Sequence, residues 1–382
     1  MKYLIFMLLY LSITTKIKAD EIKRPFQNVR SLSLGGTGVA SEKHFYALFF
    51  NPANILTRED NSFRLYLINP QISISQDGLN LVGEYSEISN AELSFGKIIK
   101  EWDEKDIYIG ANLYLGFSWK NFALALVSDG YGNFEFDIDE QDILSTEWDK
   151  AIEADAAQRF GILAGYAQDL PYGFTLGLKL KFLQKTEIRE DSEKIATELN
   201  DMDYDTLLNL YNLNLSEYMI TGEGLGIGVD IGATWEHSSW INTRLSIVAY
   251  NINETNYDLD KIFDIIDNEN KPRSEKQIFA SGVSFEKSYV WGNTTANLDI
   301  YDLTNRTKEN IFKRLHLGLM LNFLKYFSLR GGYYQGWPTY GFHIAYKIIS
   351  LEYAKYTVER SDDAGDTPDH RHSVQLNVGW NL

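Results

Sequence analysis

The last 70 residues of the chain, from Lys313 to Leu382, alternate apolar and polar side chains over most of their length. A side-chain period of two is the signature of a β-strand with one apolar and one polar face. We expect five consecutive strands here, at residues 313–324, 327–335, 338–347, 349–358 and 372–382. A soluble sandwich and a membrane barrel both show this pattern, so other features must separate them.

The same alternation continues upstream and predicts about fourteen strands in total. The other nine lie at 62–75, 110–119, 121–136, 156–169, 173–187, 222–237, 242–251, 276–288 and 293–302. Most have about ten residues or more, the length that a tilted strand needs to cross the hydrocarbon of a membrane. The pattern therefore predicts an all-β fold, an antiparallel transmembrane β-barrel. Pro70 is expected to bend or split the first strand.

The connections between the predicted strands are sorted by length. Short turns fall near residues 120, 172, 238, 325 and 347, and they alternate with long connections such as 76–109, 188–221 and 252–275. Outer-membrane barrels have short periplasmic turns and long extracellular loops. An even number of strands leaves both ends of the barrel on the short-turn side. Nothing in the architecture of a soluble sandwich requires short and long connections to alternate, so this alternation favours the barrel.

The negative charge of the chain is concentrated in the predicted long loops. The whole chain of 382 residues has a net charge of −17. Residues 137–155, 188–221, 252–275 and 359–371 hold 28 acidic residues against 8 basic ones, a net charge of −20. Nucleic-acid binding requires a basic surface and is not expected. The acidic loops are expected on the extracellular side.

The first residues resemble an export signal. Lys2 precedes an apolar run from Leu4 to Ile13, which is too short to span a membrane, and a cleavage point follows Ala19. The sequence has no cysteine, 24 tyrosines and 8 tryptophans, as expected of a barrel with aromatic girdles. We expect the outer membrane of a diderm bacterium, with a signal peptide at 1–19, an N-terminal segment at 20–58 and the barrel at 59–382.

The sequence predicts no enzymatic activity, cofactor or metal site. Its six histidines form no nucleophile-elbow or zinc-helix pattern. Asp201, Asp203 and Asp205 have the spacing that opens a calcium loop, but Thr206 replaces the required glycine and Asn212 the closing glutamate. Leucines between residues 194 and 218 are spaced for a short amphipathic helix, which would simply fold over the barrel mouth or would form a lid or a receptor surface.

Several charged residues fall on the polar face of predicted strands. A charge facing lipid costs several kcal/mol at mid-bilayer, so these side chains are expected in the lumen. They are Lys179, Lys181, Asp230, Asp299, Arg330, His343 and Glu352. One interpretation is that they pair with one another and hold whatever fills the lumen; the other is that they select a substrate. The sequence favours the first.

A glycine-rich segment and an Asn-Pro-Ala triplet lie between the signal and the first strand. The motif consists of Arg30, Gly35, Gly36, Ala40, Asn51, Pro52 and Ala53. The glycines could belong to a phosphate-binding loop, but no Lys-Ser/Thr pair follows them, and a tight turn is the simpler interpretation. The motif resembles the N-terminal region of FadL-type long-chain fatty-acid transporters and of their PorV-type and TraF-type relatives. Residues 329–341 and 351–354 resemble the latter two groups.

The resemblance implies a hatch folded inside a 14-stranded barrel and passive uptake of hydrophobic small molecules such as long-chain fatty acids. Phe45, Phe49 and Phe50 are then candidates for ligand contact. Two alternatives remain: a non-transport component of a secretion or conjugation system, and a polar diffusion porin. The expected partners are outer-membrane lipid, the barrel-insertion machinery and a hydrophobic ligand, with the chain as a monomer.

Overall fold

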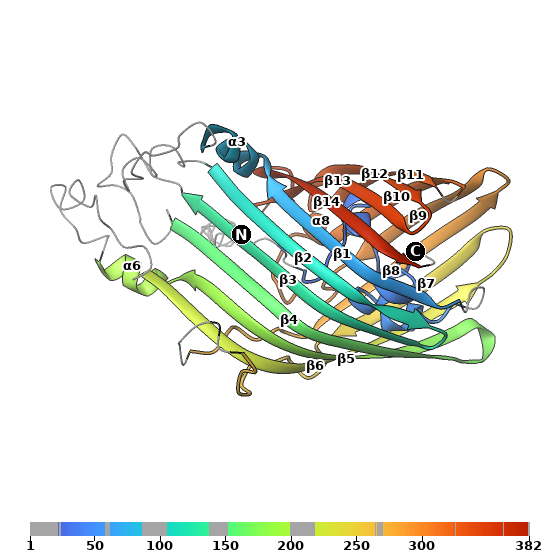
Figure 1. Ribbon diagram of the computed structural model, residues 1–382, viewed down its shortest axis with the longest axis horizontal. Helices are drawn as coiled ribbons and strands as arrows, with labels where there is room; N and C mark the ends of the chain where they lie inside the picture. The colour runs from blue at the N-terminus through green and yellow to red at the C-terminus, as the bar shows by residue number, and fades with distance from the viewer. Residues whose placement is uncertain are drawn as a thin grey trace, which may run out of the picture.

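The computed structural model describes residues 22, 24–57, 62–85, 105–136, 152–198, 218–263, 265, 270–324, 326–361 and 363–380. Fourteen antiparallel strands form a closed barrel in which each strand pairs with its neighbours in sequence and β1 pairs with β14 (Figure 1). The all-β, 14-stranded fold expected from the sequence is confirmed. The predicted signal peptide at 1–19 lies outside the described residues.

The strands are β1 (Arg64–Ser75), β2 (Lys105–Trp119), β3 (Phe122–Phe136), β4 (Ile152–Asp169), β5 (Phe174–Glu190), β6 (Met219–His237), β7 (Asn242–Tyr250), β8 (Ile278–Tyr289), β9 (Gly292–Ile300), β10 (Leu315–Phe323), β11 (Phe327–Tyr334), β12 (Trp337–Tyr346), β13 (Ile349–Glu359) and β14 (Pro368–Trp380). The helices are α2 (Val29–Ser33), η1 (His44–Phe49), η2 (Pro52–Ile55), α3 (Gln76–Tyr85), η4 (Pro171–Gly173), α6 (Ser192–Glu198) and α8 (Ile311–Arg314).

Each predicted strand position holds a strand, but several strands are longer than expected at the long-loop end. β2 begins at Lys105 instead of residue 110, and β4 begins at Ile152 instead of 156. The residues added to these strands include charged ones, among them Asp106 and Asp155, which do not continue the alternation of apolar and polar side chains. These carboxylates form ion pairs with Arg360 (3.5 Å) and Arg273 (2.8 Å) respectively.

The wall of the barrel is uneven in height. Strands β2 to β6 have 15 to 19 residues, whereas β7 and β9 to β12 have 8 to 10. The tall strands extend to the left in Figure 1, towards α3 and α6. The upper part of β6 therefore rises above β7, and its edge there is available for other segments to pair with.

The short turns and the outer surface have the features of a membrane barrel. Lys120, Tyr172, Leu324 and Lys347 have positive φ angles of 52° to 63°, which close the tight turns between strands. Exposed aromatic side chains ring this end of the barrel: Trp119, Tyr172, Trp240, Trp291, Tyr326, Tyr346 and Trp380. Apolar side chains are exposed on the outer wall above them. Such an apolar band above an aromatic girdle matches a lipid-facing surface.

The first strand is irregular near the predicted position. The pairing register of β1 shifts between Tyr66 and Asn69 against β2, just before Pro70. α6 overlaps only the first residues of the amphipathic helix predicted between 194 and 218, and the leucines on which that prediction depends lie at residues 199–217, outside the described part of the chain. None of the described helices is long and apolar enough to cross a membrane.

Candidate functional site

The N-terminal segment, residues 24–57, lies inside the barrel. Inward-facing glycines of the wall make room for it: a Cβ at Gly177 would collide with the backbone of Ala53, and one at Gly232 with the side chain of Asn51. On the opposite wall, a Cβ at Gly332 would collide with the backbone of Gly35. The segment thus contacts both sides of the lumen, and the boundary predicted at residue 58 stays a prediction.

The glycine-rich part of the motif forms a tight turn after α2. Gly35 and Gly36 have φ angles of 69° and 77°, a left-handed conformation that favours glycine. The Gly35 amide donates to Thr339 Oγ1 on β12 (3.0 Å). Arg30, on α2, forms a 2.9 Å ion pair with the buried Glu42. Ala40 is fully buried.

The Asn-Pro-Ala triplet begins the short helix η2. The Asn51 side chain accepts a hydrogen bond from the Ala53 amide (3.0 Å), and Pro52 occupies the first turn, where it needs no amide hydrogen. Next to the triplet, Asn54 accepts a hydrogen bond from Thr234 Oγ1 on β6 (2.7 Å). The triplet therefore sets the turn that docks the N-terminal segment against β5 and β6.

The three candidate phenylalanines belong to one buried aromatic cluster. The Phe45 ring stacks on Tyr66 of β1 with centroids 4.3 Å apart, and Phe49 lies 4.7 Å from the Tyr114 ring of β2. Phe49 and Phe50 also line a cavity, whereas Phe45 is not among the residues that line it. Their role in ligand contact stays a prediction.

The lumen candidates pair mostly with one another or with the N-terminal segment. Both Lys179 and Lys181 form ion pairs with Asp230, and Arg330 pairs with Glu352. Asp299 accepts hydrogen bonds from two amides of the N-terminal segment, those of Gly38 (2.7 Å) and Val39 (2.8 Å). His343 lines a cavity at the short-turn end. For Asp299 and Arg330, these contacts fit the interpretation that the charged residues of the lumen hold its content in place, in preference to the interpretation that they select a substrate.

The upper cavity lies between the N-terminal segment and the long-loop side of the wall and has a volume of about 120 Å³. Its apolar side is formed by Phe26, Phe49 and Phe50. Its polar side includes Arg24, Arg159, Lys179, Lys181, Asp230, Asn251 and Glu275. The cavity therefore combines an apolar floor with a charged wall.

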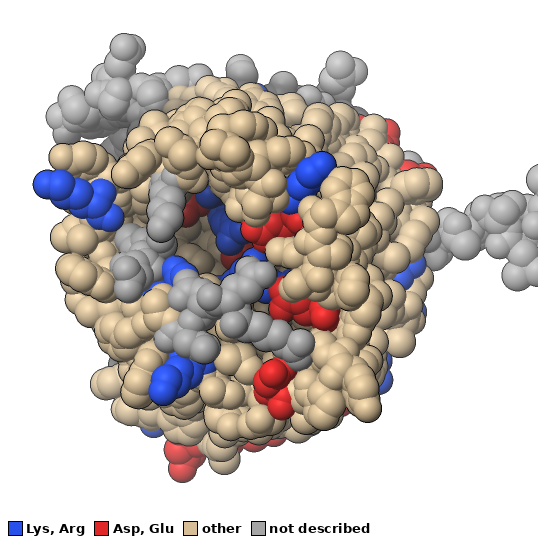
Figure 2. All heavy atoms as spheres, turned by 90° about the vertical axis from the view of Figure 1, so that its right-hand side faces the viewer, with Lys and Arg blue, Asp and Glu red and all other residues tan. Residues whose placement is uncertain are grey.

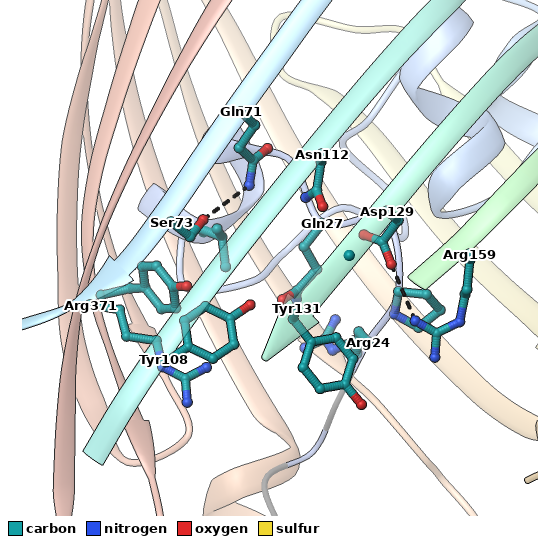
Figure 3. A pocket seen from close by; sticks show the side chains of 14 residues that line it. Arg24, Gln27, Gln71, Ser73, Tyr108, Asn112, Asp129, Tyr131, Arg159 and Arg371 are labelled. Atoms are coloured by element: carbon teal, nitrogen blue, oxygen red, sulfur yellow. Dashed lines mark hydrogen bonds and ion pairs between the residues drawn. The ribbon is translucent and has the colours of Figure 1, made fainter. Parts of the chain in front are cut away.

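A smaller pocket of about 50 Å³ adjoins it and shares Arg24, Gln27 and Arg159. Figure 3 shows side chains from the N-terminal segment and from β1 to β4 meeting around this pocket. Arg159 forms an ion pair with Asp129 (3.2 Å) there. The two spaces together form a charged chamber above the N-terminal segment.

The connection between β7 and β8 closes one side of this chamber, and the sequence did not predict its path. Its described parts are residues 251–263, 265 and 270–277. Leu259 exchanges two 3.1 Å backbone hydrogen bonds with Leu225, on the part of β6 that rises above β7. The buried Tyr257 hydroxyl donates to Glu275 (2.9 Å), which pairs with Arg159 (2.8 Å). This connection thus pairs with the edge that the short β7 leaves open.

Electrostatics hold Glu275 in its charged form. Burial alone would raise the pKa of this carboxyl, but the charges of Arg159, Lys181 and Lys185 outweigh burial and lower the pKa to about 2. Glu275 is therefore ionised at neutral pH and contributes to holding the connection in place.

The lower cavity lies below the N-terminal segment at the short-turn end and has a volume of about 260 Å³. Figure 2 shows a hollow at this end with both basic and acidic side chains inside it. Besides Arg30 with Glu42 and Arg330 with Glu352, a third pair joins Lys43 to Glu286 (2.9 Å). Each of these cations has its own carboxylate.

Comparison with known proteins identifies the fold. No protein-family model matches the chain, and no curated protein matches it in sequence. Among solved structures, the CymD monoaromatic hydrocarbon channel has a TM-score of 0.53 at 11% identity, covering 92% of this chain and 97% of that one. The Pseudomonas putida toluene transporter TodX has a TM-score of 0.52 at 10% identity, covering 96% and 100%. The Ralstonia pickettii toluene transporter TbuX has a TM-score of 0.50 at 12% identity, covering 93% and 98%.

The chain therefore has the fold of a 14-stranded outer-membrane β-barrel. More specifically, the fold is similar to that of the CymD, TodX and TbuX barrels, in agreement with the 14-stranded barrel that the sequence resemblance implied. The match extends over nearly the whole chain.

Three residues of the chamber were missed by sequence reasoning: Arg24, Arg159 and Glu275. The alternation of side chains along β4 could have identified Arg159, because this residue lies on the inner face of the strand between outward-facing neighbours, as Lys179 does on β5. Arg24 and Glu275 lie outside strands, where alternation carries no information.

Proposed function

We propose that this chain is an outer-membrane channel for the passive uptake of hydrophobic small molecules, with residues 24–57 acting as its hatch. The observation that carries the proposal is the upper cavity, whose apolar floor of Phe26, Phe49 and Phe50 lies between the hatch and the wall. Ligand sites are concave, mostly apolar and provided with a few polar groups. The proposed location is the outer membrane of a diderm bacterium, reached through a cleaved signal peptide.

The size of the cavity bears on the ligand. A cavity of roughly 150 Å³ lined by apolar side chains accommodates benzene, and the upper cavity has about 120 Å³. One aromatic ring or the end of an acyl chain matches this volume. A long-chain fatty acid would need the hatch to move before all of it could enter.

Bromobenzene provides a direct test of the binding site, because bromine is located by its anomalous scattering. Crystals of the purified barrel soaked in bromobenzene should show a bromine peak beside Phe49 and Phe50. Bromine only on the outer wall, among lipid-facing side chains, would contradict the proposal.

A disulfide can test whether the hatch must move during uptake. The chain has no cysteine, so the double variant Asn54→Cys/Thr234→Cys places the only two thiols where side-chain oxygens now lie 2.7 Å apart. Uptake into proteoliposomes should fall when the disulfide forms and recover on reduction. The reduced protein is its own control, and equal uptake in both states would show that the hatch need not leave β6.

A second candidate function is a non-transport component of a secretion or conjugation system. The firm anchoring of the hatch favours it, because Asp299, Thr339 and Thr234 all bind hatch groups from the wall. Affinity purification of the tagged protein from intact outer membranes separates the two functions. Reproducible recovery of a secretion component would support the second candidate, and recovery of this chain alone would reject it.

A further inference from the structure

The connection between β7 and β8 passes the free upper edge of β6 twice, so its two ends lie in the lumen. Gly222 and Gly224 of β6 face the lumen, as Asp230 does on the same strand. A Cβ at Gly224 would collide with the backbone of Tyr257, and one at Gly222 with the backbone of Lys271. Tyr257 and Lys271 therefore lie on the inner side of the wall.

The middle of the connection lies on the outer side. We call its described residues, 259–263 and 265, the outer segment. Gln184 follows the exposed Phe182 of β5 at a spacing of two and points outward with it. The Gln184 side chain accepts hydrogen bonds from the amides of Ile262 (3.0 Å) and Phe263 (3.1 Å) and donates one to the Phe263 carbonyl (2.6 Å). The outer segment is thus bound to the outer face of the wall.

Glu223 of β6 binds the same segment next to Gln184, whose side chain donates to its carboxylate (2.8 Å). The carboxylate also accepts a hydrogen bond from the Ile265 amide (3.3 Å) and forms an ion pair with Lys261 (3.4 Å). Glu223 and Gln184 are only 2% and 3% exposed, although both point outward. Backbone groups beside hydrocarbon need partners within the protein, because no water is present to bind them. The two side chains provide these partners.

The apolar side chains of the outer segment continue the lipid-facing band of the wall. Ile262, Phe263 and Ile265 are 57%, 54% and 55% exposed. The ring of Phe263 lies 6.1 Å from that of Phe160, which belongs to the exposed apolar band. On β5 this band runs from Phe174 to Phe182, about the length that a tilted strand needs to cross hydrocarbon. The outer segment therefore lies where the hydrocarbon ends.

A space of about 280 Å³ separates part of the outer segment from the wall. The residues that line it are Gln158, Phe160, Gln184, Thr186, Phe263 and Ile265. The wall residues among them point outward, so the space faces the lipid and not the lumen. Its combination of apolar and polar lining matches the boundary between acyl chains and headgroups.

We propose that the outer segment is a membrane anchor: its exposed side chains and the space behind them take up acyl chains of outer-leaflet lipid. Aromatic and aliphatic side chains bury themselves at this boundary when a segment binds a membrane surface. The inner part of the same connection closes the chamber through Tyr257 and Glu275. Lipid contact outside therefore stabilises the closed position inside. The inference rests on the outer-membrane location and is independent of the molecule that the channel carries.

The test places a fluorophore on each side of the wall. The chain has no cysteine, so Phe263→Cys gives a single labelling site, and Ser274→Cys, at an exposed residue of the inner part, is the matched control. Both variants carry a nitrobenzoxadiazole label in nanodiscs that contain phosphatidylcholine with a nitroxide on its acyl chain. The nitroxide should quench the label at position 263 at least three-fold more than the label at 274, and iodide should do the reverse.

Two results would overturn the anchor. One is equal nitroxide quenching at the two positions. The other is a label at 263 that neither nitroxide nor iodide quenches, because protein would then cover the outer segment.

Hydrogen exchange tests the coupling between the two sides. Phe263→Ser/Ile265→Ser should lower the protection of residues 270–277 in nanodiscs about ten-fold. Residues 302–308, in another connection, are the internal control and should keep their protection. Unchanged protection of 270–277 would overturn the coupling, and loss of protection in both regions would assign the effect to general destabilisation and overturn it too. None of these results depends on an aromatic probe, so the bromobenzene experiment tests the channel separately.

Discussion

Charged side chains are paired differently at the two ends of the lumen. Below the hatch, Arg30, Lys43 and Arg330 each have one carboxylate partner. Above it, two buried lysines share Asp230, and Arg24 has no carboxylate partner among the described residues. One-to-one pairs hold a structure together, whereas unmatched buried cations cost stability unless a ligand compensates them. The lower end therefore holds one-to-one ion pairs, whereas the upper end holds shared networks, in which Asp230 pairs with two lysines and Arg159 with two carboxylates.

The largest effect is expected from breaking a pair at the lower end. Arg330→Met leaves the buried Glu352 with the side-chain amide of Asn377 (3.1 Å) as its hydrogen-bond donor among the described residues. Removing one partner of a buried ion pair costs about 3–5 kcal/mol, and the remaining amide places the loss near 3 kcal/mol. Urea unfolding of the barrel in micelles measures this loss in the free energy of unfolding.

The double variant Arg330→Met/Glu352→Gln provides the control for that change. It removes the uncompensated carboxylate and should regain most of the lost free energy of unfolding. If the single variant were as stable as the native protein, the lower pairs would not hold the hatch, and the proposed contrast between the two ends would be wrong.

Acid should loosen the β7–β8 connection at the upper end. The pKa of Glu275 is lowered to about 2 from its ordinary 4.5, so its stabilising contribution is complete above pH 4.5 and is lost as the pH falls towards 2. The difference corresponds to about 3 kcal/mol. The protection of residues 251–263 and 270–277 against hydrogen exchange, relative to the intrinsic exchange rate at each pH, should fall as the pH is lowered from 4.5 towards 2.

The variant Glu275→Gln distinguishes this cause from general acid unfolding. Its protection against hydrogen exchange in these residues should already be low at pH 7 and should change little on acidification. An unchanged pH profile in the variant would mean that other carboxylates near the mouth control the β7–β8 connection.

The hatch separates the two ends of the lumen. A substitution at an inward-facing glycine of the barrel wall can disturb the packing of the hatch against that wall. The position of a Cβ at Gly177 is occupied by the backbone of Ala53, whereas the nearest atom to a Cβ at Gly130 is 3.7 Å away. Gly177→Ala should therefore cost about 1–3 kcal/mol through overpacking, and Gly130→Ala should be tolerated. Trypsin cleavage after Lys43 reports release of the hatch; equal resistance of the two variants would contradict this docking.

Sequence reasoning predicted the strands well and the chamber poorly, for a physical reason. Alternation and tight turns are local, so the pattern around Leu176–Leu180 sufficed to place β5 and to direct Lys179 and Lys181 into the lumen. Pairing between distant segments has no such local signal. The contact of Arg24 with His316 joins residues 292 positions apart, and the pairing of Leu259 with Leu225 on β6 depends on the unequal heights of β6 and β7.

The smallest stability change is expected at the upper end. Lys181→Met removes one of two lysines from Asp230 and leaves Lys179 and Asp230 as a neutral pair, so the cost is limited to the lost contact with Asn251 and to a weaker charge interaction with Glu275. We expect the free energy of unfolding to change by less than about 1 kcal/mol. A loss as large as that of Arg330→Met would show that Lys181 is as important to the fold as Arg330, and the contrast between shared networks above the hatch and one-to-one pairs below it would fail.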